Sequence, residues 1–482
     1  MSTSAVSTSD ALPRLSRALP GTPPAAPVRI VHLGLGNFHR AHQAWYTAHA
    51  GDAADWGIAA FTGRRPDAAE ALAPQDGLST LITRASDGDA FELISSLTAV
   101  HAASDHEAYL DYLRRPEVAV VTITVTEQGY LADATRQLRR TDEVAADIAT
   151  LQEDLAAAVS TLPGRLVAGL AARRAAGAGP ITVLSCDNLP ENGEVAASVV
   201  TQLAQAVDPA LAEWIGEHVD FASSMVDRIT PATTEADRTL VATELGYLDA
   251  SPVATEPFHE WVMSGTFPAG RPRWEDAGAR VVEDVTPFEQ RKLWLLNGSH
   301  SLLAYAGSIR GHASIDEAIA DPACRRWVEA LWDEASPHLP LAPDDVATYR
   351  AALLDRYANP RIRHRLAQIA ADGSTKIVVR TVPVIRAERT AGRVPLGCAT
   401  VVAAWILHLR GRGAPLSDPG AEPYLPLVAT DDERTVRAVL DLLDPPRGVA
   451  AGLGSDDDLV AAVRSQLSAI VEGAGVDAGE AS

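Results

Sequence analysis

The chain has 482 residues, of which 47% are hydrophobic and 22% charged, and its formal net charge is −22. This length favours two domains, and the negative charge argues against nucleic acid or an anionic membrane as partner, because both attract basic surfaces. The three cysteines form no CxxC pair, so we expect neither a disulfide framework nor a cysteine zinc site. Without a signal peptide or a long apolar run, a cytoplasmic protein is expected.

The first part of the chain predicts an α/β domain over residues 28–284, preceded by a flexible tail at residues 1–27 that is rich in Ser, Ala and Pro. Strands and helices alternate along this domain, which is typical of a parallel sheet with ligands at the strand ends. We expect strands in VRIVHL, DWGIAAFTG, LSTLITRA, AFELISSLTAV, AVVTITV and PITVLS, and a helix in LVAGLAARRAAGAG.

The sequence pattern changes after about residue 285. Ala, Leu and Arg follow helical spacing over 316–335, 345–372, 396–411 and 432–444. Residues 285–482 are therefore predicted to form a second, mostly helical domain.

A glycine turn follows the first predicted strand and opens a helix, as in a dinucleotide-binding motif. Gly34 and Gly36 lack side chains, so the backbone can approach a pyrophosphate closely. The third glycine of the motif is missing, and His39 stands in its place. A bare tight turn is the alternative interpretation.

Residues after the second strand bear on the choice between NAD and NADP. Asp67 is placed to bind a ribose 2′-hydroxyl, which favours NAD. Arg64 and Arg65 lie in the same stretch and would suit the 2′-phosphate of NADP instead.

Lys292 and Lys376 are the only two lysines among 41 basic residues. Arginine serves salt bridges and solubility, but only lysine offers an amine that can lose its proton near neutral pH. On an ideal α-helix Glu289, His300 and Asn297 lie at about 60°, 80° and 140° from Lys292, so all four can face one cleft. An amphipathic helix with polar residues at its edge is the alternative.

This set suits the oxidation of an alcohol by hydride transfer. Lys292 would take the hydroxyl proton if its pKa were lowered from about 10.4 towards 7–8. Neutral amides such as Asn188 and Asn297 would stabilise the oxyanion without competing for the proton. A Cys/His ligand set for a zinc dehydrogenase is not apparent.

Several motifs resemble the mannitol dehydrogenase family of polyol-specific long-chain dehydrogenases and reductases. They are IVHLGLGNFHRAHQAWYT, TVTEQGY, VLSCDNLPENG, MVDRITPAT, EPFHEWV, GRPRWEDAGARVVEDVTPFEQRKLWLLNGSHS and ANPRIRHRLAQIAADGSTK. The resemblance implies a Rossmann-type N-terminal domain, a helical C-terminal domain, NAD, no metal, and a monomer or weak oligomer.

The resemblance also implies roles for individual residues. Lys292 would be the general base, Asn188 and Asn297 the oxyanion donors, His300 the residue that orients the substrate, and Glu289 part of a proton relay. Further residues would contact the cofactor (Gly34, Gly36, Asn37, Phe38, Asp67) or the substrate (Asp227, Arg363, His364, Lys376).

The stretch RIRHRLAQIAADGSTK bears on the substrate. Arg363, His364 and Arg365, followed by Gln368, resemble fructuronate reductase more than mannitol 2-dehydrogenase, and the arginines would suit a substrate carboxylate. Surface residues of an Arg-rich helix are the alternative. Mannitol, arabinitol and mannitol 1-phosphate stay open as substrates, and so does a catalytically silent sugar or nucleotide sensor on the same fold.

Overall fold

The computed structural model describes residues 12–429, 433–445 and 452–472. The chain divides into two compact units, residues 1–286 and residues 287–482, which we describe separately. In the described part of the chain, no helix has both the length and the apolar character needed to cross a membrane.

Unit 1 is built on a mostly parallel sheet of eight strands among the described residues, in the order β11-β10-β8-β7-β6-β1-β2-β5. Its strands are β1 (Val28–Leu33), β2 (Gly57–Phe61), β5 (Leu97–His101), β6 (Val120–Ile123), β7 (Ile181–Ser185), β8 (Val219–Asp227), β10 (Glu260–Ser264) and β11 (Arg280–Val281). β10 pairs antiparallel with β8 and parallel with β11, so these two edge strands run opposite to the other six. The strand order reverses between the neighbouring strands β1 and β6, and ligands of such sheets bind at this point.

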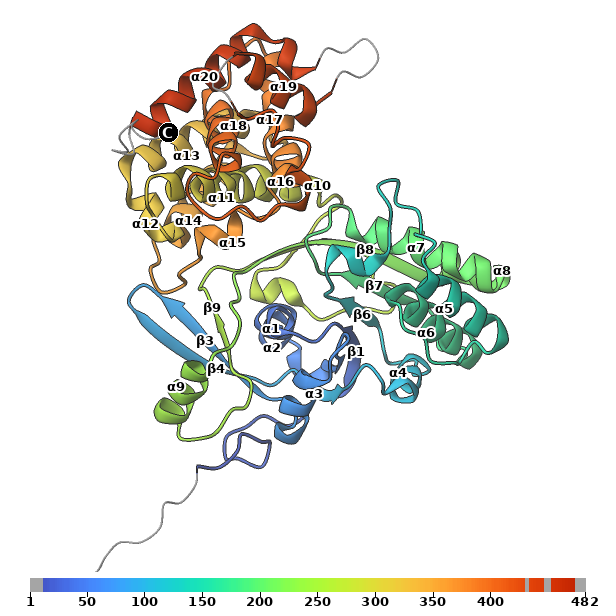
Figure 1. Ribbon diagram of the computed structural model, residues 1–482. Helices are drawn as coiled ribbons and strands as arrows, with labels where there is room; N and C mark the ends of the chain where they lie inside the picture. Colours follow the sequence, from blue (N-terminus) through green and yellow to red (C-terminus); the bar gives the residue numbers. More distant parts are fainter. Residues whose placement is uncertain (1–11, 430–432, 446–451, 473–482) are drawn as a thin grey trace, which may run out of the picture. The chain divides into compact units, whose positions relative to one another are not determined.

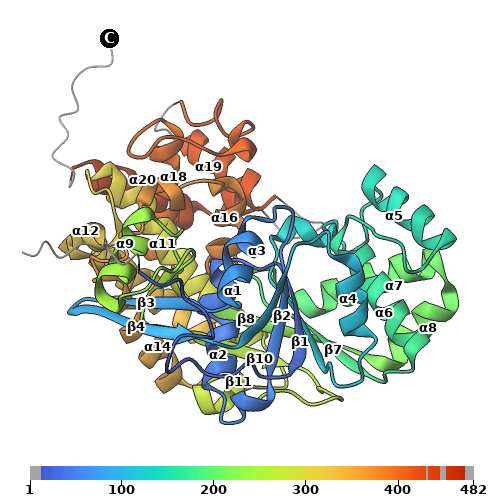
Figure 2. The same cartoon turned by 90° about the horizontal axis from the view of Figure 1, so that it is seen from below.

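Successive side chains of the strands serve two separate cores, one on each face of the sheet. One face is covered by α4 (His106–Leu113), α5 (Asp142–Glu153), α6 (Leu162–Ala176), α7 (Asn192–Val207) and α8 (Pro209–His218) (Figure 2). The other is covered by α1 (Asn37–Ala41), α2 (Gln43–His49), α3 (Asp67–Leu72) and a small sheet of β3 (Ser79–Ala85), β4 (Gly88–Ile94) and β9 (Val253–Thr255). Helix α9 (Glu235–Leu245) completes the unit.

Unit 2 is helical throughout its described residues (Figure 1). Its α-helices are α10 (Thr286–Arg291), α11 (Gly298–Leu302), α12 (Ile315–Ala320), α13 (Pro322–Ala335), α14 (Pro343–Tyr357), α15 (Leu366–Ile369), α16 (Gly373–Arg380), α17 (Val382–Thr390), α18 (Leu396–Leu409), α19 (Glu433–Leu443) and α20 (Asp457–Glu472). Helix α18 is buried from Gly397 to Leu409, and α11, α13, α16, α17 and α20 pack around it.

Short 3-10 turns connect several of these elements. They are Ala53–Asp55, Ala73–Gln75, Glu127–Tyr130, Trp274–Ala277, Ser336–His338, Pro419–Ala421 and Leu453–Ser455. Two further segments, Lys292–Asn297 and Leu303–Gly307, are π-helical and interrupt the helix that runs from α10 through α11.

The expected flexible tail is wrong for residues 12–27. Leu15 is fully buried, and its backbone N–H donates to the carbonyl of Leu248 (2.9 Å). Arg17 donates to the carbonyls of Ser95 and Leu97 (both 2.8 Å). This segment is therefore held by packing and hydrogen bonds in spite of its composition, and residues 1–11 lie outside the described part.

Several predicted elements are divided in the structure. The expected strand AFELISSLTAV becomes β4 and β5, which belong to different sheets. Pro322 starts a new helix within 316–335, with Asp321 as its N-cap. The predicted helix over 345–372 ends at Tyr357, because the following Asn359-Pro360 pair disfavours helical backbone.

Candidate active site

A cavity of about 630 Å³ opens in unit 1 at the carboxyl ends of β6, β7 and β8. It is lined by Phe38 of α1, by residues 124–128 after β6, by residues 186–188 after β7, and by Val226 of β8. This is the edge of the sheet at which a parallel α/β fold binds its ligand. Two predicted site residues, Phe38 and Asn188, therefore line one cavity.

The two glycines of the predicted cofactor turn are there for different reasons. Gly34 has φ +109°, and a Cβ on it would lie 1.9 Å from the carbonyl oxygen of Thr124, so the fold itself requires glycine. A Cβ on Gly36 would meet nothing nearer than the carbonyl oxygen of Gly34 at 3.8 Å. Gly36 is thus not required by its protein neighbours, and its small size leaves room for a ligand to approach the backbone.

Asn37 and His39, which follow this turn, are engaged within unit 1. The Asn37 amide donates to the carbonyl of Pro231 (3.2 Å) and to Thr233 Oγ1 (3.0 Å), which ties α1 to that loop. The His39 ring is fully buried and stacks on His32 of β1, with ring centroids 3.4 Å apart. Burial, reinforced by neighbouring cationic groups, holds the pKa of His39 well below its ordinary value. A neutral imidazole therefore packs where the motif has its third glycine.

Asp187 is a functional candidate that sequence reasoning missed. It is buried in the cavity wall, and burial raises its pKa to about 6. The Tyr130 hydroxyl donates to one carboxyl oxygen, and the Leu189 N–H donates to the other (3.0 Å). Asp187 thereby anchors the turn that carries the exposed Asn188. Its position directly after a predicted strand was the only available signal.

The two predicted acidic residues of unit 1 lie in different surroundings. Asp227 is buried and is the last residue of β8, directly after Val226 of the cavity wall. Asp67 is exposed, begins α3 after the turn that follows β2, and pairs with Arg65 at 3.5 Å. This ion pair joins Asp67, which would favour NAD, to Arg65, which would favour NADP.

In unit 2, Lys292 and Asn297 bracket a π-helical segment, which corrects the regular helix expected from the sequence. The backbone N–H of Gly298 reaches the carbonyl of Leu293, five residues back. This wider turn brings residues five apart closer to one face than the roughly 140° of an α-helix. Both side chains are half-buried, as is that of Glu289 in the preceding α10. Such π segments occur frequently at functional sites.

His300 lies in the next turn, and its ring lies beside that of His364, another of the predicted site residues. Its ring is 5.1 Å from the Tyr357 ring and 5.2 Å from the His364 ring, measured between centroids. His300 is 7% exposed, and no hydrogen-bond partner for its Nε2 exists among the described residues. A buried ring nitrogen in this state is suited to a hydroxyl group of a bound molecule.

Cationic groups surround His300. Burial is the largest cause that lowers its pKa, followed by the neighbouring His364 and by the charges of Arg356, Arg380 and Lys376. Lys376 is immobilised by hydrogen bonds to the carbonyls of Ile369 (3.1 Å) and Ala371 (2.6 Å). Lys376 and Arg380 are one turn apart on α16, so they lie on the same side of that helix.

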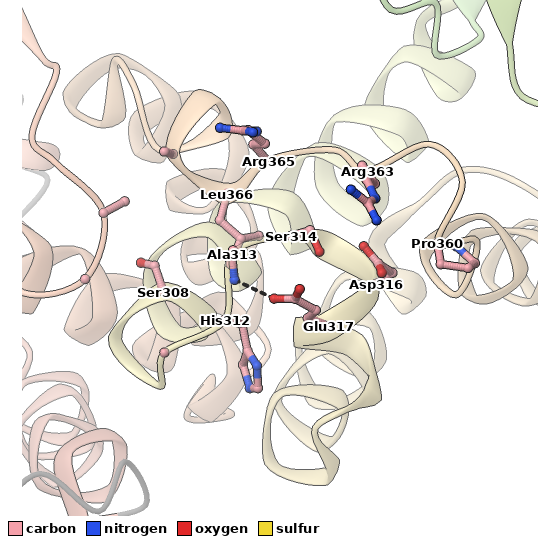
Figure 3. Close-up of a pocket in the computed structure, with 14 residues that line it drawn as sticks. Ser308, His312, Ala313, Ser314, Asp316, Glu317, Pro360, Arg363, Arg365 and Leu366 are labelled. Carbon is pink, nitrogen blue, oxygen red and sulfur yellow. Dashed lines mark hydrogen bonds between the residues drawn. The ribbon is translucent and has the colours of Figure 1, made fainter. Parts of the chain in front are cut away.

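Arg363 and Arg365 lie away from this group. Both line a separate cavity of about 570 Å³ together with Asp316 and Glu317. Figure 3 shows Arg363 beside Asp316, while Arg365 points away from it. His364 is not among the residues that line this cavity, and the backbone turns at Arg363, whose φ is +46°. The structure therefore does not bring Arg363 together with His300.

A group of possible metal ligands also occurs in unit 2, where the sequence predicted none. Ligand atoms of His312, Asp321 and Cys324 lie within 4.8 Å of one another. Arg310 Nε donates to the Asp321 carboxylate (2.5 Å), and His312 lies 3.1 Å from the same oxygen. A guanidinium already neutralises this carboxylate, so the group is explained as an ion-pair network.

Comparison with known proteins identifies the class to which these features belong. Residues 28–276 match the Mannitol dehydrogenase Rossmann domain, and residues 284–471 match the Mannitol dehydrogenase C-terminal domain. The chain belongs to the mannitol dehydrogenase family, and it is an oxidoreductase. The family and the fold class predicted from the sequence are confirmed.

Curated relatives include enzymes of different specificity. D-mannonate oxidoreductase of Escherichia coli (strain K12) is 40% identical over 394 residues, which are 80% of this chain and 80% of that protein. Mannitol 2-dehydrogenase of Pyrenophora tritici-repentis (strain Pt-1C-BFP) is 40% identical over 397 residues, 79% of this chain and 69% of that protein.

Solved structures show the same architecture. Pseudomonas fluorescens mannitol 2-dehydrogenase, in a ternary complex with NAD and D-mannitol, has a TM-score of 0.75 at 34% identity and covers 93% of this chain and 94% of its own. A substrate-free D-sorbitol dehydrogenase has a TM-score of 0.82 at 31% identity, covering 93% and 95%.

Proposed function

We propose that the protein interconverts D-mannonate and D-fructuronate with NAD, and that Lys292 is the general base. The observation that carries the substrate assignment is the set of cations around the unpaired Nε2 of His300. A sugar acid brings a carboxylate, which forms charge-assisted hydrogen bonds with these cations, whereas a neutral polyol offers them only hydroxyl oxygens. The D-mannonate oxidoreductase at 40% identity supports the same choice.

The residues of unit 2 divide the chemistry of alcohol oxidation. The amine of Lys292 takes the hydroxyl proton, and Glu289, one turn earlier, passes it on. The Asn297 amide donates to the oxygen as negative charge develops on it. His300 holds a neighbouring hydroxyl through its unpaired Nε2.

Unit 1 supplies the remaining groups. Asn188 is the second oxyanion donor, and Asp227 is a substrate residue on the buried end of β8. Residues Gly34, Gly36 and Phe38 hold the cofactor, and the space beside Gly36 fits a closely approaching pyrophosphate. NAD, when bound, supplies the hydride acceptor for the oxidation.

We assign NAD in preference to NADP because Asp67 would repel a 2′-phosphate. Arg65 is paired with Asp67 and so is partly neutralised. The solved relative that holds NAD at 34% identity supports this choice. An NADP preference would mean that Arg64 and Arg65 contribute more to cofactor binding than Asp67 does.

Mannitol 2-dehydrogenase is the second candidate function. It is favoured by the relative of that name at 40% identity and by the solved complex with D-mannitol. Arg363 lines another cavity and does not lie beside His300, which weakens the sequence-based argument for a sugar acid as substrate.

Steady-state kinetics with fructuronate and fructose as the reduced pair, and mannonate and mannitol as the oxidised pair, separate these functions. A hydrogen-bonded charged contact is worth roughly 1.5–3 kcal/mol, so we expect kcat/KM to favour the acid about 10- to 150-fold. Equal values for mannonate and mannitol would restore mannitol 2-dehydrogenase. Absence of turnover on all four, with NADH still bound, would favour the silent sensor. Repeating the series with NADP(H) tests the cofactor assignment.

A further inference from the structure

Three consecutive backbone carbonyls at the end of the π-helical segment accept hydrogen bonds from side chains of three other helices. The donor–acceptor pairs are Trp332 Nε1 to Leu295 (2.9 Å), the Tyr357 hydroxyl to Leu296 (3.2 Å) and Arg380 Nη1 to Asn297 (3.1 Å). The donors come from α13, α14 and α16, so segments distant in the sequence converge on the segment that carries Lys292 and Asn297.

These donors are well placed to act on the geometry of the helix. Trp332 and Tyr357 are 1% and 2% exposed, so water does not compete for their hydrogen bonds. Ser299 joins the same group, because its hydroxyl lies 2.7 Å from the Tyr357 hydroxyl and donates to the carbonyl of Leu295 (2.5 Å). Arg380 Nη1 also reaches Ser301 Oγ (3.1 Å), on the following turn.

The segment needs such support because π-helical hydrogen bonding is rare and usually extends over a single turn. If the segment returned to regular α-helical hydrogen bonding, its hydrogen-bond register would shift. For each residue of that shift, the residues after the segment would rotate by about 100° about the helix axis relative to those before it. The side chains of Lys292 and Asn297 would then no longer have their present orientation relative to each other. External donors that bind the carbonyls in their present register oppose this change.

We propose that Trp332, Tyr357 and Arg380 are positioning residues that hold the Lys292 amine and the Asn297 amide in register by fixing the π-helical segment. This inference rests on the proposed function, in which Lys292 is the base and Asn297 an oxyanion donor. The three residues act through the backbone of Leu295, Leu296 and Asn297.

The double variant Trp332→Phe/Tyr357→Phe tests this inference, since it removes two donors and retains both aromatic rings. We expect kcat to fall about 10- to 100-fold, the scale of a small misplacement of catalytic groups. The NADH Kd and the substrate KM should change by less than about threefold, and the pH midpoint of kcat/KM should shift. Purely structural donors would lower Tm and leave the kcat of the folded enzyme and its pH profile unchanged.

Tyr424→Phe is the matched control, because it removes a buried tyrosine hydroxyl that donates to the Leu442 carbonyl (3.5 Å), outside the π-helical segment. It should retain the parent kcat and pH profile. A folded double variant with parent kcat and pH profile would overturn the inference. If the double variant does not fold, the single variant Trp332→Phe decides by the same two results. Failure of the proposed function is seen separately, as retained turnover in Lys292→Arg.

Discussion

The two units position their functional residues by different physical means. In unit 1 the cavity residues follow the ends of regular parallel strands, so their location is a consequence of strand order. In unit 2 the proposed base and a proposed oxyanion donor lie on a π-helical segment, whose carbonyls accept hydrogen bonds from α13, α14 and α16. A strand-end site can therefore be inferred from local sequence, whereas an irregular helix depends on contacts distant in the sequence.

One buried histidine from each unit shows a further difference between the units. His39 and His300 are both buried, and the pKa of each is held well below its ordinary value. His39 stacks on His32 inside the core of unit 1, which is a packing role. His300 has cations around it and lies beside His364. Burial and a lowered pKa alone thus do not distinguish a site residue from a core residue.

Removal of an oxyanion donor should give the largest of the graded effects. Asn297→Ala and Asn188→Ala should each lower kcat by about 10²- to 10³-fold, because each amide contacts the oxygen as its charge develops. Steady-state kinetics with saturating NADH provides the measurement. A rise in KM with unchanged kcat would mean that these residues bind substrate without special contact to the transition state.

Lys376 and Arg363 offer a second contrast, now within unit 2. Lys376→Met should lower kcat/KM for the sugar acid by about 10- to 150-fold, since its charge reaches His300. Arg363→Ala should change it less than about threefold, because Arg363 lines the other cavity. The sequence alone suggested a strong, acid-selective effect of Arg363. A large loss in Arg363→Ala would restore that interpretation.

Acid should destabilise unit 1 through its buried histidines. Burial lowers the pKa of His32 and of His42 from 6.5 to about 3. Between these values the unfolded chain binds more protons, so stability present above about pH 6.5 is lost as the pH falls towards 3. At pH 5 each histidine accounts for a loss of about 2 kcal/mol. Asp187, with a pKa raised to about 6, opposes this as a single group.

Thermal unfolding at pH 7 and pH 5 measures this effect. His42→Gln should reduce the difference in unfolding free energy between the two pH values by about 2 kcal/mol. The same difference between pH 7 and pH 5 in the parent and in His42→Gln would show that His42 is not held neutral in the folded chain.

Much of the fold could be predicted from the sequence, because strand and helix periodicities are local properties. The glycine turn after β1 and the turn at Asn188 followed from strand ends for the same reason. The π-helical segment could not be predicted, since its carbonyls are bonded by Trp332, Tyr357 and Arg380, which lie far away in the sequence. The separation of Arg363 from His364 follows a left-handed turn at Arg363, in a segment that the sequence assigned to a helix.

The central claim is that the amine of Lys292 takes the substrate proton, and Lys292→Arg tests it most directly. Arginine retains the positive charge but stays protonated, because its pKa is far above neutral pH, so it cannot act as a base there. We predict that turnover is lost at every pH between 6 and about 10, with an unchanged NADH Kd and an unchanged circular dichroism spectrum. A Lys292→Arg enzyme with parent kcat and the parent pH profile would contradict the account.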